Sequence, residues 1–92
     1  MGYPKKISIA VPGTKYQIKV DLSKRDCRFK RAHCHVYDGT KKIAKVYFDT
    51  CLFAEVPNWI SYTEQNLILN TVDKHNLELW LAYDNNAKYG TD

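Results

Sequence analysis

Two stretches near the start of the chain alternate apolar and polar positions. Residues 7–11 place isoleucine or valine at every second position, and residues 15–20 do the same with tyrosine, isoleucine and valine. A period of two is the spacing of a β-strand with one buried face. Pro12 and Gly13 lie between the stretches and favour a turn, because proline presets φ and glycine permits positive φ. The pattern predicts a β-hairpin.

A second pair of β-rich stretches follows at residues 33–37 and 43–48. Asp38 and Gly39 lie between them, and this dipeptide favours a type I′ turn, in which both central residues take positive φ. We therefore predict a second hairpin. In its second stretch we expect one set of alternate residues to face the core: Ala44, Val46 and Phe48.

The period changes after residue 56. Residues 52–56 are compatible with a short strand that Pro57 ends. Ser61 and Glu64 then have the spacing of a capping box, in which Ser61 is the N-cap. Apolar residues recur at helical spacing over residues 67–72, which predicts a helix.

A second helix is expected close behind the first. His75 and Asn76 indicate a break, with Asn76 as the new N-cap, and Gly90 is expected to end the second helix. Trp80 has helical spacing relative to neighbouring leucines, and Trp59 directly precedes the capping box. We expect both tryptophans to belong to the core.

Strands first and helices last are typical of an α+β domain. We predict one domain over residues 1–92, with a small antiparallel sheet of about four strands in two hairpins and a C-terminal pair of helices packed on one face. A hydrophobic fraction of 45% and a charged fraction of 26% argue against disorder. No apolar stretch suits a signal peptide or a membrane span, and three cysteines without CxxC spacing argue against a disulfide framework. A cytoplasmic location and no membrane partner are expected.

The segment between the predicted hairpins is strongly basic and has no sustained period, so we expect a connection or an irregular strand entry. The formal net charge of +4 favours an acidic partner, either nucleic acid or an acidic or nucleic-acid-binding protein. Lysine and arginine contact phosphates, and exposed aromatic rings stack on unpaired bases. A solvated loop without a partner is the alternative. The residues expected to bind the partner are Lys24, Arg25, Arg28, Phe29, Lys30, Arg31, His33, His35 and Tyr37.

His33 and His35 are separated by one residue, so on a strand both point to one face and Cys34 points to the other. Such a pair can be satisfied by hydrogen bonds, can contact a partner, or can share a metal ion. A metal ion would need further ligands, and the spacing selects none of the candidates. These are His75, Asp49, Cys27 and Cys51. We therefore predict no metal and no other cofactor.

The segment AHCHVYDGTKKIAKV, residues 32–46, resembles a small, uncharacterised bacterial family, a domain of unknown function. Members carry a histidine–aromatic–histidine strand, a glycine turn and a second strand, followed by a helix, a short break and a tryptophan-bearing helix. This chain has Arg31-Ala32 where the family has two prolines, and Cys34 where it has an aromatic residue. The resemblance implies this fold and an occurrence in toxin–antitoxin or mobile-element loci, and it transfers no active site. The corresponding residues are His33, His35, Gly39, the strand at 43–48, His75 and Trp80.

Two functions from different classes fit these observations. The preferred one is a non-enzymatic, basic macromolecule-binding module, bacterial or encoded by a phage or mobile element, which modulates a partner as an antitoxin or as an inhibitor of a nucleic-acid-handling host system. The alternative is a small ribonuclease-type toxin, in which the basic segment grips RNA and His33 and His35 act as general base and acid. The sequence has no glycine-rich phosphate loop, paired carboxylates or nucleophile elbow. Catalytic residues are therefore expected only in the alternative.

Overall fold

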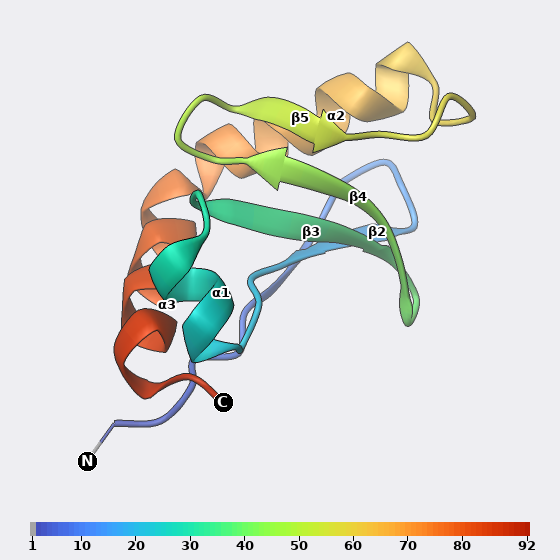
Figure 1. Ribbon diagram of the computed structural model, residues 1–92. Helices are drawn as coiled ribbons and strands as arrows, with labels where there is room; N and C mark the ends of the chain where they lie inside the picture. The colour runs from blue at the N-terminus through green and yellow to red at the C-terminus, as the bar shows by residue number, and fades with distance from the viewer. Residues whose placement is uncertain (1) are drawn as a thin grey trace.

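The computed structural model describes residues 2–92 and shows an α+β domain with one antiparallel sheet (Figure 1). The five strands follow one another across the sheet in chain order, so the sheet is a meander. The α+β prediction is confirmed, with five strands where about four were expected, because the stretch after the second hairpin also pairs. The elements are β1 Ser8–Ala10, β2 Tyr16–Lys19, α1 Lys24–Phe29, β3 His33–Asp38, β4 Lys41–Tyr47, β5 Leu52–Glu55, α2 Tyr62–Lys74 and α3 Asn76–Tyr89.

Both predicted hairpins are present, but the second turns one residue later than predicted. Asp38 lies within β3, opposite Tyr16 and Lys41 on the neighbouring strands. The central residues of the turn are Gly39 and Thr40, and of these only Gly39 has positive φ, at 62°. Glycine with positive φ at the first central position is the pattern of a type II′ turn, so the predicted type I′ turn is wrong. The pairing of Asp38 on both sides holds it in the extended conformation.

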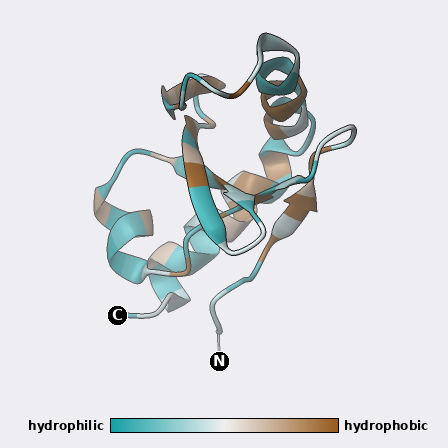
Figure 2. Ribbon diagram, turned by 90° about the vertical axis from the view of Figure 1, so that its right-hand side faces the viewer, coloured by the Kyte–Doolittle hydropathy of each residue, from teal (hydrophilic) through white to brown (hydrophobic). Residues whose placement is uncertain are grey.

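The core lies between one face of the sheet and the helices α2 and α3 (Figure 1). Ala44 and Val46 of β4, and Phe48 directly after it, are 4%, 0% and 1% exposed, so their predicted inward orientation is confirmed. In Figure 2 brown and teal segments alternate along the strands and around the helices, as expected of elements that bury one side only. The buried residues of α3 are Leu79, Ala82, Tyr83 and Asn86.

The two tryptophans lie in different environments. Trp80 is half-buried and packs edge-on against Phe48, with ring centroids 4.9 Å apart, in agreement with the prediction. Trp59 is 58% exposed, so its predicted place in the core is wrong. Ile60, the residue that follows it, is only 2% exposed and takes the buried position before α2.

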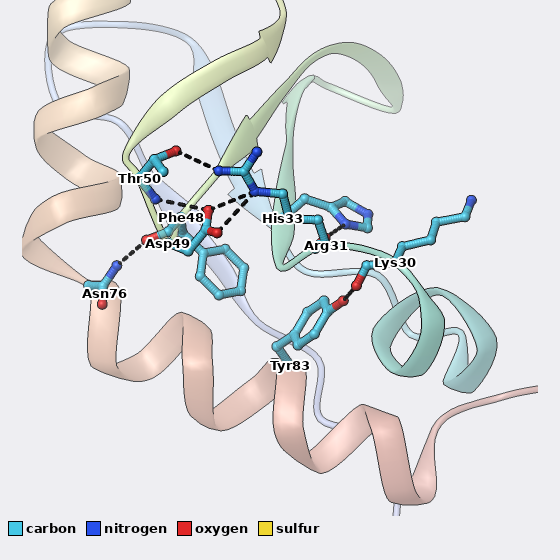
Figure 3. A network of polar contacts seen from close by, with 8 residues as sticks. All are labelled: Lys30, Arg31, His33, Phe48, Asp49, Thr50, Asn76 and Tyr83. Atoms are coloured by element: carbon cyan, nitrogen blue, oxygen red, sulfur yellow. Dashed lines mark hydrogen bonds and ion pairs between the residues drawn. The ribbon is translucent and has the colours of Figure 1, made fainter.

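The basic segment between β2 and β3 forms the short helix α1 instead of the predicted irregular connection. Ser23 caps it, because its Oγ accepts a hydrogen bond from the main-chain nitrogen of Asp26 at 3.3 Å. Cys27 is buried beneath it. The Tyr83 hydroxyl of α3 lies within hydrogen-bond distance of the main-chain oxygens of Asp26 and Lys30, and Figure 3 shows the contact with Lys30. A helix of six residues is under two turns long and leaves no clear period in the sequence. Contacts with α3 therefore stabilise α1 in this conformation.

The break between the two C-terminal helices is where the sequence predicts it. Ser61 caps α2 by accepting a hydrogen bond from the main-chain nitrogen of Glu64, and Gly90 follows the end of α3, so both predictions are confirmed. The N-cap of α3, however, is His75 and not Asn76. The Asn76 side chain donates instead to the main-chain oxygen of Phe48 at 2.8 Å (Figure 3), which ties the start of α3 to the end of β4. Over residues 2–92, none of the helices has the length and apolarity needed to cross a bilayer.

Candidate functional site

Folding as a helix divides the basic segment into inward and outward sides. Cys27 faces the core, so Arg25, Arg28 and Phe29 share the opposite side of α1 at i, i+3 and i+4 spacing. All three are exposed, Phe29 at 78%. We call these three residues the helix patch. Neither arginine has a carboxylate partner among residues 2–92.

The other cations of the segment form ion pairs within the chain. Lys30 Nζ lies 2.9 Å from Asp26, and Lys24 Nζ lies 3.9 Å from Asp92. Arg31 Nε lies 3.0 Å from the carboxylate of Asp49. Lys24, Lys30 and Arg31, which the sequence predicts to be partner-binding residues, therefore have carboxylate partners within the chain. Asp26 lies one helical turn before Lys30, whereas Asp92 and Asp49 come from distant positions in the sequence.

Figure 3 shows how Arg31 is held. Its Nε donates to Asp49, and its guanidinium also donates to the hydroxyl of Thr50 at 3.3 Å. The guanidinium carbon lies 4.1 Å from the ring centroid of Tyr47. Arg31 therefore links the start of β3 to the end of β4, and its first role is structural.

The face of the sheet opposite the helices carries a second group of cations. Lys19, His35 and Lys45 lie side by side on β2, β3 and β4, because they are direct partners in the strand register. The next rows add two tyrosines and a further lysine. We call this surface the outer face: Lys19, His35, Tyr37, Lys42, Lys45 and Tyr47.

Lysines of the outer face lie over its tyrosine rings. Lys19 Nζ is 4.8 Å from the ring centroid of Tyr37, and Lys45 Nζ is 5.6 Å from that of Tyr47. Within residues 2–92, Lys19, Lys42 and Lys45 have no carboxylate within salt-bridge distance. Sequence reasoning did not select these lysines. The alternation placed Lys19 and Lys45 opposite the core, but only the register shows that they flank His35.

His33 is buried at 2% exposure, although it shares the outward side of β3 with His35. Its Nδ1 lies 2.7 Å from the main-chain oxygen of Arg31 (Figure 3). A carbonyl oxygen only accepts, so Nδ1 carries the proton and Nε2 keeps its lone pair. The ring also packs edge-on against Tyr83, with centroids 6.1 Å apart. Burial lowers the pKa of His33, so the ring is neutral near pH 7.

His35 lies beside His33, with ring centroids 5.0 Å apart and the rings nearly perpendicular. Burial, followed by the nearby cation of Lys42, lowers the pKa of His35 to about 4. Its Nδ1 is buried and, among the described residues, has no hydrogen-bond partner. Buried polar atoms are nearly always satisfied, so this nitrogen marks a place where a ligand is expected.

Asp21 completes a cluster with the two histidines. One ligand atom from each of Asp21, His33 and His35 lies within 4.8 Å of the others. Paired residues of β2 and β3 have numbers that sum to 54, as in Lys19 with His35, so continuing this register places Asp21 opposite His33. Sequence reasoning missed Asp21, and its distance from β3 in the chain left no local signal.

The ligand candidates named from the sequence lie elsewhere or have other partners. His75 contacts Glu78, Asp49 holds Arg31, and the Cys51 thiol donates to the main-chain oxygen of Leu69. The Cys27 thiol donates to the main-chain oxygen of Asp21 at 3.3 Å. Cys34 is fully buried on the core side of β3, so its predicted orientation away from the histidines is confirmed.

We expect the metal-free protein to lose stability as the pH falls from about 6.5 toward 4. In this range an unfolded histidine binds a proton while folded His35 stays neutral, so this contribution to stability is complete above the range and is lost progressively through it as the pH falls. One titrating group changes the free energy of unfolding by at most about 1.4 kcal/mol per pH unit. The contribution of His35 should be smaller, because its ring is partly solvated. Urea unfolding at several pH values in chelator-treated buffer measures it. His35→Gln should flatten the slope and His75→Gln should not; equal slopes in all three proteins would contradict this assignment.

Comparison with known proteins gives no match: no protein-family model, no curated protein and no solved structure aligns significantly with this chain. The resemblance of residues 32–46 to the histidine-containing family therefore stays a prediction.

Proposed function

We propose that this protein is a small basic binding module that holds single-stranded nucleic acid on the outer face of its sheet. The observation that carries the proposal is the row Lys19–His35–Lys45 on the outer face, in which two lysines without carboxylate partners among residues 2–92 flank a histidine. Lysines provide the phosphate contacts that dominate affinity for nucleic acid. The helix patch supplies two further arginines, for which the described part of the chain provides no carboxylate partner.

Tyr37 and Tyr47 favour nucleic acid over an acidic protein surface. A partly exposed lysine–ring contact contributes about 0.5–1 kcal/mol, whereas stacking of a base on an aromatic ring contributes about 1–3 kcal/mol. A base can therefore replace Lys19 on the face of Tyr37 while the lysine turns to the neighbouring phosphate. A single strand offers a phosphate and a stacking base at every nucleotide, whereas an acidic protein surface offers carboxylates without this regular pairing.

Such a module acts by occupying its partner, and this suits an antitoxin-like protein or an inhibitor of a nucleic-acid-handling system. It needs no cofactor for this role. The geometry gives less support to the ribonuclease alternative. His33 is buried with its Nδ1 proton on a main-chain oxygen, and neutral His35 has a pKa too low to act as a general acid near pH 7.

Replacing three lysines of the outer face tests the proposal. We expect Lys19→Gln/Lys42→Gln/Lys45→Gln to weaken binding of a labelled single-stranded oligonucleotide by about 10- to 100-fold. The slope of log K against log salt should fall by about 2, because each lost phosphate contact on a single strand contributes roughly 0.7. Fluorescence anisotropy at several salt concentrations measures both quantities.

A matched variant separates the outer face from net charge. Lys5→Gln/Lys74→Gln/Lys88→Gln removes the same three charges, from +4 to +1, at exposed positions away from the outer face. This control should change affinity by less than about threefold. Equal weakening by the two variants would mean that the outer face is not the site, and binding of an acidic protein in place of nucleic acid would also contradict the proposal. Cleavage of RNA that is lost in a His35 variant would contradict the binding proposal and support the ribonuclease alternative.

A further inference from the structure

We infer that Asp21, His33 and His35 bind one zinc ion. Two imidazoles and one carboxylate are a zinc ligand set, and with three protein ligands the tetrahedral ion keeps its fourth position for water or another ligand. The three residues lie close together because β2 and β3 are paired neighbours. Asp21 follows β2 by two residues, and His33 and His35 are the first and third residues of β3. This inference goes beyond the proposed function and does not depend on nucleic-acid binding.

The ligand atoms are close to binding distance. Zinc bonds to nitrogen and oxygen are about 2.0–2.2 Å long, so two ligand atoms on one tetrahedral ion are about 3.3–3.6 Å apart. The cluster spans at most 4.8 Å between ligand atoms. The ligand atoms must move closer together when the ion binds, and the half-buried His35, whose Nδ1 has no partner among residues 2–92, is the ligand that no hydrogen bond at this nitrogen holds in place.

Hydrogen bonds to the main chain orient two of the three ligands. Metal-binding histidines commonly donate their other ring nitrogen to a carbonyl or carboxylate, and His33 does so through Nδ1 to Arg31, which leaves Nε2 for the ion. The Asp21 carboxylate accepts a hydrogen bond from the main-chain nitrogen of Ser23 at 2.9 Å through Oδ1, which leaves Oδ2 for the ion. These contacts hold the ligands in place before a metal arrives.

His35 provides the independent observation. Its Nδ1 is buried without a partner among residues 2–92, and His35 belongs to the cluster with His33 and Asp21, so a metal ion bound through Nδ1 would satisfy this nitrogen. An aliphatic side chain at this position would avoid the cost of burying an unsatisfied nitrogen.

The charges around the cluster set the expected strength. Asp21 offsets one of the two positive charges of zinc, and Asp26 adds a second carboxylate, which Lys30 partly neutralises at 2.9 Å. Lys42 and Lys45 disfavour the charged form of His35 and would also repel a cation. We therefore expect weaker binding than at a four-ligand structural zinc site.

Titration of the metal-free protein with zinc alone tests the inference. We expect one zinc ion per chain, saturable at micromolar concentrations by calorimetry, and a rise in melting temperature with zinc. Asp21→Asn and His35→Asn should each weaken zinc binding by at least about 100-fold. Losing a group that only hydrogen-bonds a metal ligand already weakens metal binding by about 10- to 100-fold, and losing the ligand itself should cost more. Circular dichroism shows that each variant is folded; the buried His33 is left intact for this reason.

His75→Asn and Asp73→Asn are the matched controls, because they remove the same chemical groups from α2 and the α2–α3 junction. Each should change zinc affinity by less than about threefold. Absence of saturable zinc binding by the folded wild type overturns the inference, as does a loss in His75→Asn equal to that in His35→Asn. The lysine triple variant of the outer face should bind zinc at least as tightly as wild type, so failure of the nucleic-acid proposal and failure of the zinc site are distinguishable.

Cobalt(II) distinguishes this ligand set from a cysteine site. Cys34 lies on the core side of β3, opposite the histidines, and the Cys27 thiol donates to the main-chain oxygen of Asp21, so neither sulfur is placed as a ligand of this cluster. Bound cobalt should show the visible absorption of a tetrahedral site without a thiolate charge-transfer band. Appearance of that band would show that a cysteine is a ligand and would overturn the assignment.

Discussion

Phe48→Ala should lower the free energy of unfolding by about 4 kcal/mol, the largest effect expected of any single substitution here. Phe48 is 1% exposed and lies between two aromatic residues of α3. Its ring centroid is 4.9 Å from that of Trp80 and 5.5 Å from that of Tyr83, and both pairs are edge-on. Truncation removes the transfer energy of the ring, leaves a cavity and breaks two favourable aromatic contacts. The effect is a large share of the roughly 5–14 kcal/mol expected for a domain of 92 residues.

Thermal and urea unfolding measure this loss, and Phe29→Ala is the matched control. Phe29 is 78% exposed in the helix patch, so the same truncation there should cost less than about 0.5 kcal/mol. The melting temperature of Phe48→Ala should fall by about 15–30 °C. A difference between the two variants of less than about 1 kcal/mol would show that α3 does not pack on the sheet through Phe48.

Asn86→Ala should lower the free energy of unfolding by about 3 kcal/mol. Asn86 is fully buried in α3, and its Oδ1 accepts from the main-chain nitrogen of Lys5 at 2.6 Å. Its Nδ2 donates to the main-chain oxygens of Lys5 and Asp21 at 3.2 and 3.0 Å. Alanine leaves these buried main-chain groups without partners, and each such group costs about 1–3 kcal/mol. One side chain thus holds both the segment before β1 and the segment after β2 against α3.

Asn85→Ala is the matched control for this prediction. Asn85 also donates to a main-chain oxygen, that of Tyr3 at 2.8 Å, but the contact is exposed and water can replace it. Urea unfolding should show a loss of less than about 1 kcal/mol for Asn85→Ala. Because Asn86 positions the main chain of Asp21, Asn86→Ala should also weaken zinc binding while Asn85→Ala leaves it unchanged. Equal unfolding free energies for the two variants would contradict the role of Asn86 in holding these two segments against α3.

The elements of this fold are largely predictable because their signals are local. Alternation over residues 7–11 and 15–20 gives β1 and β2, and the serine of the capping box marks the start of α2. These patterns depend on a residue and its neighbours within one turn or one strand. Helix α1 escaped prediction because it is too short for a period and depends on Tyr83, more than fifty residues further along the chain.

The candidate sites are less predictable, because they depend on partners distant in sequence. Nothing near Arg31 in the chain indicates that Asp49 neutralises it, and nothing near His33 indicates that Asp21 lies opposite. Composition alone shows a basic protein, but it does not show which cations are paired. The division of the basic segment into ion-paired residues and a helix patch is therefore a property of the folded chain.

By itself, the sequence determined that this protein has an antiparallel sheet followed by two helices, and that His33 and His35 share one side of a strand. Hydrophobic periodicity is sufficient for this, since a strand or an amphipathic helix must bury one side. Only the tertiary structure decided which side chains meet. Strand register placed Lys19 and Lys45 beside His35, and packing against α3 buried His33 and brought Asp21 to it. Register and packing depend on contacts across the whole chain, and these contacts leave no local pattern.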